Sequence, residues 1–173
     1  MVDTRAHLEA SDPRPPLVVL GIGNLLMGDE GVGVHAVQLL EPLAGPLGAD
    51  VVDGGTGGFH LLDLFCEYPY MILIDATLDD QNPGEVKVIE PKYATDYPSS
   101  LSAHDIGLKD LIESAQALGA SPKVYLITVS IAVIQNMVMD LSPKVEAALG
   151  PIKTKVLELA LKVHHGMAAP AQT

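Results

Sequence analysis

Apolar residues in this chain fall into short runs separated by polar and glycine-rich segments. The run YMILID, residues 70–75, is apolar at nearly every position, which is typical of a strand covered on both faces of its sheet. Residues 85–90 instead alternate apolar and polar side chains, which predicts a half-exposed strand at a sheet edge. The predicted strands are 17–21, 51–54, 70–75, 85–90 and 123–129.

Helical spacing of apolar residues appears between these strands. The predicted helices are 31–40, 59–67, 105–118 and 143–163. Strands that alternate with helices predict an α/β protein, with three layers: a mostly parallel twisted sheet of about five strands and helices on both faces.

Two of the helices carry more detailed predictions. Phe59, Leu62 and Cys66 have the spacing of one buried face. Ser142 and Pro143 are typical of an N-cap and a first helical position, and the pair Gly150-Pro151 predicts a kink or a break.

The length of 173 residues fits one domain. We expect residues 1–16, which end in three prolines, to form a flexible lead-in. Residues 17–163 would form the single α/β domain, and residues 164–173 a flexible tail.

Composition excludes several classes of function. A net charge of −12 argues against binding nucleic acid, which requires clustered Lys and Arg. The longest apolar stretch, Val124 to Ile134, has 11 residues, whereas a membrane-spanning helix needs about 20, so we expect no membrane insertion. The amino terminus lacks the apolar core of a signal peptide, and Cys66 is the only cysteine, so the expected compartment is the cytoplasm.

The segment LVVLGIGNLLMGDEGVG, residues 17–33, is a predicted strand followed by a glycine-punctuated loop and a helix start. Gly21 and Gly23 fit a dinucleotide fingerprint, but Leu26 stands where the third glycine belongs. Asp29 and Glu30 would repel a pyrophosphate at the helix start, so a nucleotide site is disfavoured.

Three polar residues follow separate elements whose ends should meet at one edge of the sheet. Glu30 follows the first strand, Asp75 closes the central strand, and His104 precedes a helix. Two carboxylates and an imidazole suit a divalent first-row metal, and three protein ligands would leave coordination positions open.

Ordinary structural roles are the alternatives for these residues. Asp29 or Glu30 could complement the positive end of a helix, and Asp75 could cap the turn that follows it. His104 could be a surface or capping residue. The chain lacks a G-x-S-x-G elbow, an H-E-x-x-H sequence and a C-x-x-C pair, so the common hydrolase and protease motifs are absent.

Four ordered motifs resemble the hydrogenase maturation endopeptidases across roughly residues 17–160. They are GIGNLLMGDEGVG at 21–33, DGGT at 53–56, ILIDA at 72–76 and SAHD at 102–105. The resemblance implies a five-stranded sheet and removal of a carboxyl-terminal extension from the large-subunit precursor of a nickel–iron hydrogenase once nickel has been inserted. It also implies that the metal-binding residues of the family are Glu30, Asp75 and His104 here.

On this resemblance, nickel arrives on the substrate, and the same ligands could hold another divalent cation in the isolated protein. Glu30, Asp75 and His104 would also be the catalytic residues, acting through a metal-polarised carbonyl or through general-base activation of water by Glu30 or Asp75. Asn24 and the turn Gly54–Gly58 would shape a groove for the substrate tail, or the turn is simply tight. The alternative function is a non-catalytic metal-sensing or chaperone module on the same scaffold.

Overall fold

The computed structural model describes residues 14–92, 96–98, 101 and 108–168. Its sheet has the strand order β2-β1-β3-β5-β4. Strands β1, β2, β3 and β5 are parallel, and β4 pairs with β5 in the antiparallel direction. The strands are β1 (Leu17–Gly21), β2 (Ala49–Asp53), β3 (Tyr70–Thr77), β4 (Val86–Ile89) and β5 (Lys123–Ser130). The predicted fold class is confirmed, and the alternating strand lies at the edge as expected.

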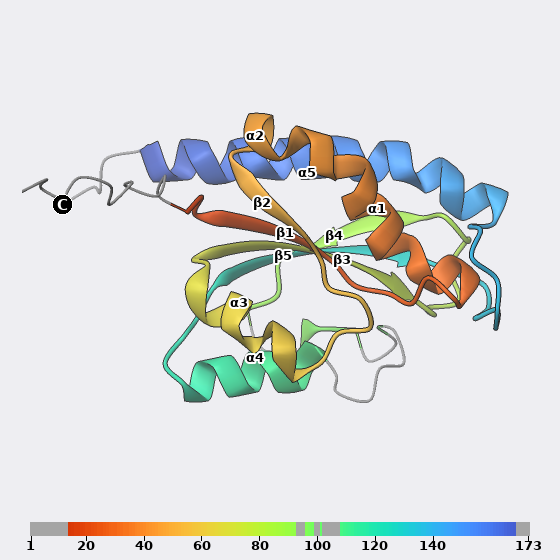
Figure 1. The fold of residues 1–173 in the computed structure, drawn as a ribbon, viewed down its shortest axis with the longest axis horizontal. Coiled ribbons are helices and arrows are strands. Elements are labelled where there is room, and N and C mark those ends of the chain that lie inside the picture. The colour runs from red at the N-terminus through yellow and green to blue at the C-terminus, as the bar shows by residue number, and fades with distance from the viewer. Residues whose placement is uncertain (1–13, 93–95, 99–100, 102–107, 169–173) are drawn as a thin grey trace, which may run out of the picture.

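Helices cover the sheet on both faces (Figure 1). One face carries α1 (Val32–Leu40), the short α2 (Ala44–Leu47) and α5 (Pro143–Ala168). The other face carries α3 (Leu62–Glu67) and α4 (Leu108–Ala117). Three 3-10 turns complete the described elements: η1 (Gly28–Gly31), η2 (Glu41–Leu43) and η3 (Phe59–Leu61).

The central strands bury both of their faces, which explains their continuous apolar sequence. On β3, Ile72 and Ile74 join the core beneath α1 and α5, whereas Met71 and Leu73 join the core beneath α3 and α4. All four side chains are fully buried. Successive residues of a strand point to opposite faces, so each apolar residue contributes to one of two cores.

The buried face predicted for residues 59–67 is wrong. Phe59 is 52% exposed and Cys66 is exposed, whereas Leu61 and Phe65 are buried. The segment starts as the 3-10 turn η3, which has about 3.0 residues per turn rather than 3.6, before it becomes α3. This change of pitch moves the buried side of the helix away from the face that regular α-helical spacing predicts.

The break predicted at Gly150-Pro151 is also wrong, since α5 continues from Pro143 to Ala168 with Pro151 inside it. Its buried residues Val145 and Ile152 lie on both sides of the proline, so packing on the sheet keeps the helix continuous there, and a kink at this point stays a prediction. The helix also ends later than predicted, and His164 Nε2 lies 2.8 Å from the Leu47 carbonyl oxygen.

None of the helices in the described ranges has the length and hydropathy to span a membrane.

Candidate functional site

The connections of the sheet diverge where β1 and β3 lie side by side. The connection from β1 to β2 contains α1 on one face, and the connection from β2 to β3 contains α3 on the opposite face. In open α/β sheets, ligands bind at such a switch point, just outside the carboxyl ends of the strands. The candidate acids Glu30 and Asp75 both belong to elements at this point.

The loop that follows β1 folds back across the end of β3. The Ile22 N–H donates to the Ile74 carbonyl at 2.9 Å, and η1 contacts β3. Gly23 lies so close to η1 that a Cβ on it would be 2.3 Å from the Glu30 carbonyl oxygen. Glu30 therefore lies beside the loop after β1. That loop is hydrogen bonded to Ile74, the residue before Asp75.

Two glycines of the motif allow α1 to pack directly on the strands. A Cβ on Gly21 would lie 2.1 Å from the Gly33 carbonyl oxygen. A Cβ on Gly33 would lie 2.2 Å and 2.3 Å from the carbonyl oxygens of Ile22 and Ile74. Both glycines therefore have a packing role, and Gly21, which also fits the nucleotide fingerprint, is explained by this packing.

Glu30 is a buried acid, with 2% of its surface exposed. Its Oε2 accepts a hydrogen bond from the Asn24 N–H at 2.6 Å. Burial raises the pKa of Glu30, and the hydrogen bond from Asn24 opposes that rise. Because ionisation of this side chain is costly in the buried site, a nearby cation would stabilise its carboxylate.

Asp75 is equally buried, at 2% exposed. Its Oδ1 accepts the N–H of Ala76 at 2.8 Å. The pairing of β1 with β3 ends at Gly21 and Ile74, whereas β3 continues to Thr77 beside β5. Asp75 thus occupies the first position beyond the end of β1, next to the returning loop.

Hydroxyl side chains surround Asp75 on its face of the sheet. Asp75 pairs in register with Thr128, and Thr77 pairs with Ser130. Each of these three hydroxyl residues is at most 2% exposed. None of the three is among the predicted site residues, although their alternation at the carboxyl ends of two apolar runs is a usable signal.

The third predicted ligand, His104, lies outside the described residues. Within the ranges that the structure describes, no group of three His, Cys, Asp or Glu side chains is close enough to hold a metal ion. The structure therefore places two of the three predicted donors, Glu30 and Asp75, on elements that contact each other.

Asp29, the neighbour of Glu30, has a different role. Its carboxylate accepts hydrogen bonds from the Ser142 N–H at 2.6 Å and from the Ser142 hydroxyl at 2.8 Å. Ser142 immediately precedes α5, so Asp29 complements the positive end of that helix. The helix-end role considered for this acidic pair thus belongs to Asp29, and it acts on α5 rather than on the helix that follows it.

The second glycine-rich segment is hydrogen bonded to the loop after β1. The Gly54 N–H donates to the Gly21 carbonyl, and the Gly23 N–H donates to the Gly55 carbonyl, both at 2.8 Å. Asp53 Oδ1 accepts the Gly55 N–H at 2.8 Å, as in an Asx turn. The two glycine segments together form one edge of the candidate site.

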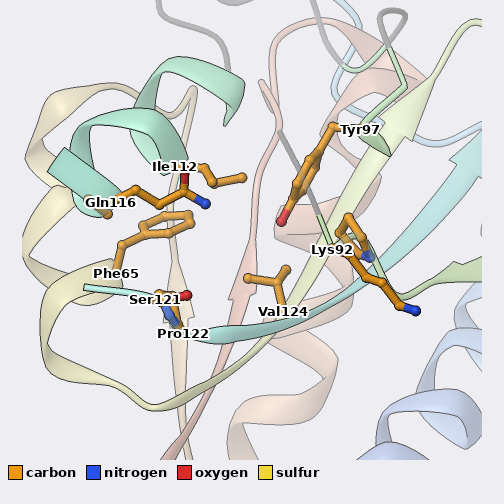
Figure 2. A pocket seen from close by; sticks show the side chains of 10 residues that line it. Phe65, Lys92, Tyr97, Ile112, Gln116, Ser121, Pro122 and Val124 are labelled. Carbon is orange, nitrogen blue, oxygen red and sulfur yellow. The ribbon is translucent and has the colours of Figure 1, made fainter. Parts of the chain in front are cut away.

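A cavity of about 380 Å³, partly open to solvent, lies at the other end of the sheet, away from these acids. Figure 2 shows Tyr97 across the cavity from Phe65 and Ile112, with Val124 between them. Val124 is at the amino end of β5, whereas Asp75 is near the carboxyl end of β3. Burial raises the pKa of Tyr97, but the cavity has no acidic or histidine side chain in its lining.

The fold and the site define an α/β protein with a mostly parallel sheet and a buried acidic centre at the switch point of that sheet. A sequence model of the hydrogenase maturation protease family matches residues 34–159. The chain belongs to this family, and it is therefore a peptidase.

Individual relatives agree with this assignment. The hydrogenase 2 maturation protease of Escherichia coli K12 is 31% identical over 144 residues, which cover 82% of this chain and 88% of the relative. The hydrogenase expression/formation protein HupM of Azotobacter chroococcum is 33% identical, covering 90% of this chain and 75% of the relative. The solved structure of the maturating endopeptidase HybD from E. coli superimposes with a TM-score of 0.72 at 28% identity, covering 87% of this chain and 93% of that one.

Proposed function

We propose that this peptidase removes the carboxyl-terminal extension from the nickel-loaded large-subunit precursor of a nickel–iron hydrogenase. Membership of the hydrogenase maturation protease family supports the substrate class. The observation that carries the proposal is the pair of buried carboxylates, Glu30 and Asp75, on contacting elements at the switch point of the sheet. In line with the single cysteine, the reaction takes place in the cytoplasm.

His104 is proposed as the third donor of the same centre. Leu101 forms a bridge with Thr77, which lies two residues after Asp75. Three residues of extended chain span at most about 10 Å, so the chain leaving Leu101 is long enough to bring an imidazole to Asp75. Two carboxylates and one imidazole form a donor set that suits nickel and leaves positions open for the ligands that the precursor supplies.

The centre would recognise the nickel of the precursor, and another divalent cation could bind to it in the isolated protein. Nickel held by Glu30, Asp75 and His104 would supply Lewis-acid polarisation of a substrate carbonyl. Glu30 and Asp75 are buried carboxylates, and burial raises the pKa of Glu30, so a bound cation would favour its charged form. In the alternative mechanism, Glu30 or Asp75 would be the general base that takes a proton from the attacking water.

The test compares a nickel-loaded precursor with the same precursor prepared without nickel. We expect the protein to shorten only the loaded form, by the mass of one carboxyl-terminal peptide, as measured by intact mass spectrometry. Equal cleavage of both forms would contradict recognition of nickel. Nickel-dependent binding without a change in the mass of the precursor would instead support the non-catalytic metal-sensing or chaperone module.

Two variants test the residues of the centre. Asp75→Asn and His104→Ala should each abolish cleavage while leaving the circular dichroism spectrum and thermal unfolding close to those of the wild-type protein. Normal cleavage by both variants would show that the peptidase uses other residues.

A further inference from the structure

Two loops are joined beside the candidate site: the loop after β1 and the loop between β5 and α5. The Gly28 N–H donates to the Val138 carbonyl at 2.7 Å, and the Val138 N–H donates to the Leu26 carbonyl at 3.2 Å. The side chain of Gln135 packs on Gly28, where a Cβ would lie 2.1 Å from Gln135 Oε1. The two loops therefore form one surface, although more than 100 residues separate them in the sequence.

This surface is unusually apolar for an exposed region. Met137 is 83% exposed, Met139 is 59% exposed and Leu26 is 50% exposed. We define the apolar rim as the exposed apolar residues of the two loops, Leu26, Val133, Met137, Val138 and Met139. Grouped apolar side chains of this kind mark sites of interaction on the surface of a protein, whereas single ones do not.

The backbone of the apolar rim is held in a conformation that displays Met137. This residue has φ of 61°, in the left-handed region that non-glycine residues rarely adopt. The adjacent Val138 is fixed by hydrogen bonds to Leu26 and Gly28, and the Met139 carbonyl lies 3.2 Å from His35 Nε2 of α1. Such strain persists only where surrounding contacts impose it, and it is found preferentially at binding and active sites.

The apolar rim is continuous with the acidic centre. Asn24, whose N–H binds the Glu30 carboxylate, also accepts the Leu26 N–H through Oδ1 at 2.9 Å. On the other loop, Gln135 Oε1 lies 3.4 Å from the Asp29 N–H. The segment that positions Glu30 thus continues directly into the apolar rim, so a chain bound at the acids would meet these side chains next.

We propose that the apolar rim docks an apolar segment of the precursor polypeptide close to its cleavage site. This inference rests on the proposed function. A second copy of this chain fits less well, because it would cover the loop that holds Glu30 and close the centre to its substrate. The net charge of −12 and the exposed Asp140 favour an apolar segment with neutral or basic neighbours. Flexible methionine side chains can adapt to the shape of such a segment.

The test replaces the two methionines in one variant, Met137→Asn with Met139→Gln. Asparagine tolerates the left-handed conformation better than methionine, so the loop should keep its fold. The matched control is Leu161→Gln with Met167→Gln, because these residues of α5 are 60% and 48% exposed and lie outside the two loops. We expect the KM for nickel-loaded precursor to rise about tenfold in the rim variant, with the loss in KM rather than kcat, and to stay unchanged in the control.

Binding measurements separate this inference from the proposed function. Precursor binding is measured by biolayer interferometry in the Asp75→Asn background, with and without the rim substitutions. Rim-dependent binding without cleavage by the wild-type protein would support docking and overturn the proposed function. Cleavage by the wild-type protein with equal KM and equal binding in the rim variant would overturn docking. A rim variant that changes only the oligomeric state, measured by light scattering, would also overturn docking and assign the surface to self-association. Neither cleavage nor binding by any form would overturn both.

Discussion

The two ends of the sheet differ in what they bury. Every buried Asp, Glu, Ser and Thr in the described part of the chain lies at or beside the carboxyl ends of the strands, namely Asp29, Glu30, Asp75, Thr77, Thr128 and Ser130. The amino end instead buries apolar side chains, such as Leu17 and Val124, and contains the cavity that Phe65 and Tyr97 line.

Apart from Asp29, which is hydrogen bonded to Ser142, this difference separates residues that serve stability from those that we assign to the chemistry. Burying apolar surface stabilises a fold, whereas burying carboxylates costs free energy unless they are paired. Concentrating that cost at one end is expected where the acids have a function. The cavity at the amino end has a volume of about 380 Å³ but no acidic side chain in its lining. The presence of a cavity therefore does not by itself identify the chemical site.

The largest expected effect is on catalysis and follows from Glu30→Gln. The amide keeps the size of the side chain but cannot supply negative charge or take a proton, so precursor cleavage should slow at least about a hundredfold. The fold should persist, since the carboxylate is destabilised by burial. Single-turnover cleavage measured by mass spectrometry checks this, with the exposed Glu41→Gln as the control. Cleavage within about threefold of the wild-type rate would show that Glu30 does not take part in catalysis.

Asp29→Ala should have the opposite profile, with its main effect on stability. It removes an acceptor of two hydrogen bonds from Ser142 in a buried position at the start of α5. We expect the free energy of unfolding to fall by about 2–4 kcal/mol, measured by urea denaturation. Asp29→Asn, which keeps an amide oxygen as an acceptor, should lose less. If the alanine variant is as stable as the wild-type protein, the two adjacent acids do not divide their roles in this way.

Much of the sheet could be predicted from sequence because its pattern is local. Continuous apolar runs predict β3 and β5, and alternation predicts the edge strand β4. The position of Asp75 at the end of a run was enough to place it at the carboxyl edge of the sheet. For α3, local spacing predicted the wrong face, because the 3-10 turn before it is not visible in an apolar pattern.

Contacts between distant segments could not be predicted in the same way. The residues near Asp29 do not indicate that Ser142 donates hydrogen bonds to it. The motif GDEG gives both acids the same local context. The apolar rim depends on backbone hydrogen bonds between two loops, and backbone groups have no sequence signature of their own. His104, expected from its motif, remains a prediction.

The amino end offers a test through Tyr68, whose hydroxyl donates to Asp50 of β2. Burial and the interaction with Asp50 raise the pKa of Tyr68 to about 12, whereas an unfolded tyrosine has a pKa near 10. The folded state therefore holds its proton more tightly, and this contribution to stability is complete below about pH 10 and is lost as the pH rises through 12. Urea denaturation of wild-type protein and Tyr68→Phe should show a difference of about 1–2 kcal/mol at pH 9 that shrinks by pH 11.5. A difference independent of pH would contradict this account.

The smallest expected effect is a gain in stability from Ser130→Ala. The Ser130 hydroxyl is buried at the carboxyl end of β5 and has no hydrogen-bond partner among the described residues. Removing an unpaired buried hydroxyl should stabilise the fold by about 1 kcal/mol, which raises the Tm of a domain of this size by about 2–4 °C. Ser142→Ala is the matched control with the opposite sign, because that hydroxyl donates to Asp29 at 2.8 Å. A lower Tm for Ser130→Ala would show that the Ser130 hydroxyl is hydrogen bonded. Ser130 would then stabilise the fold, as the buried apolar residues at the amino end of the sheet do.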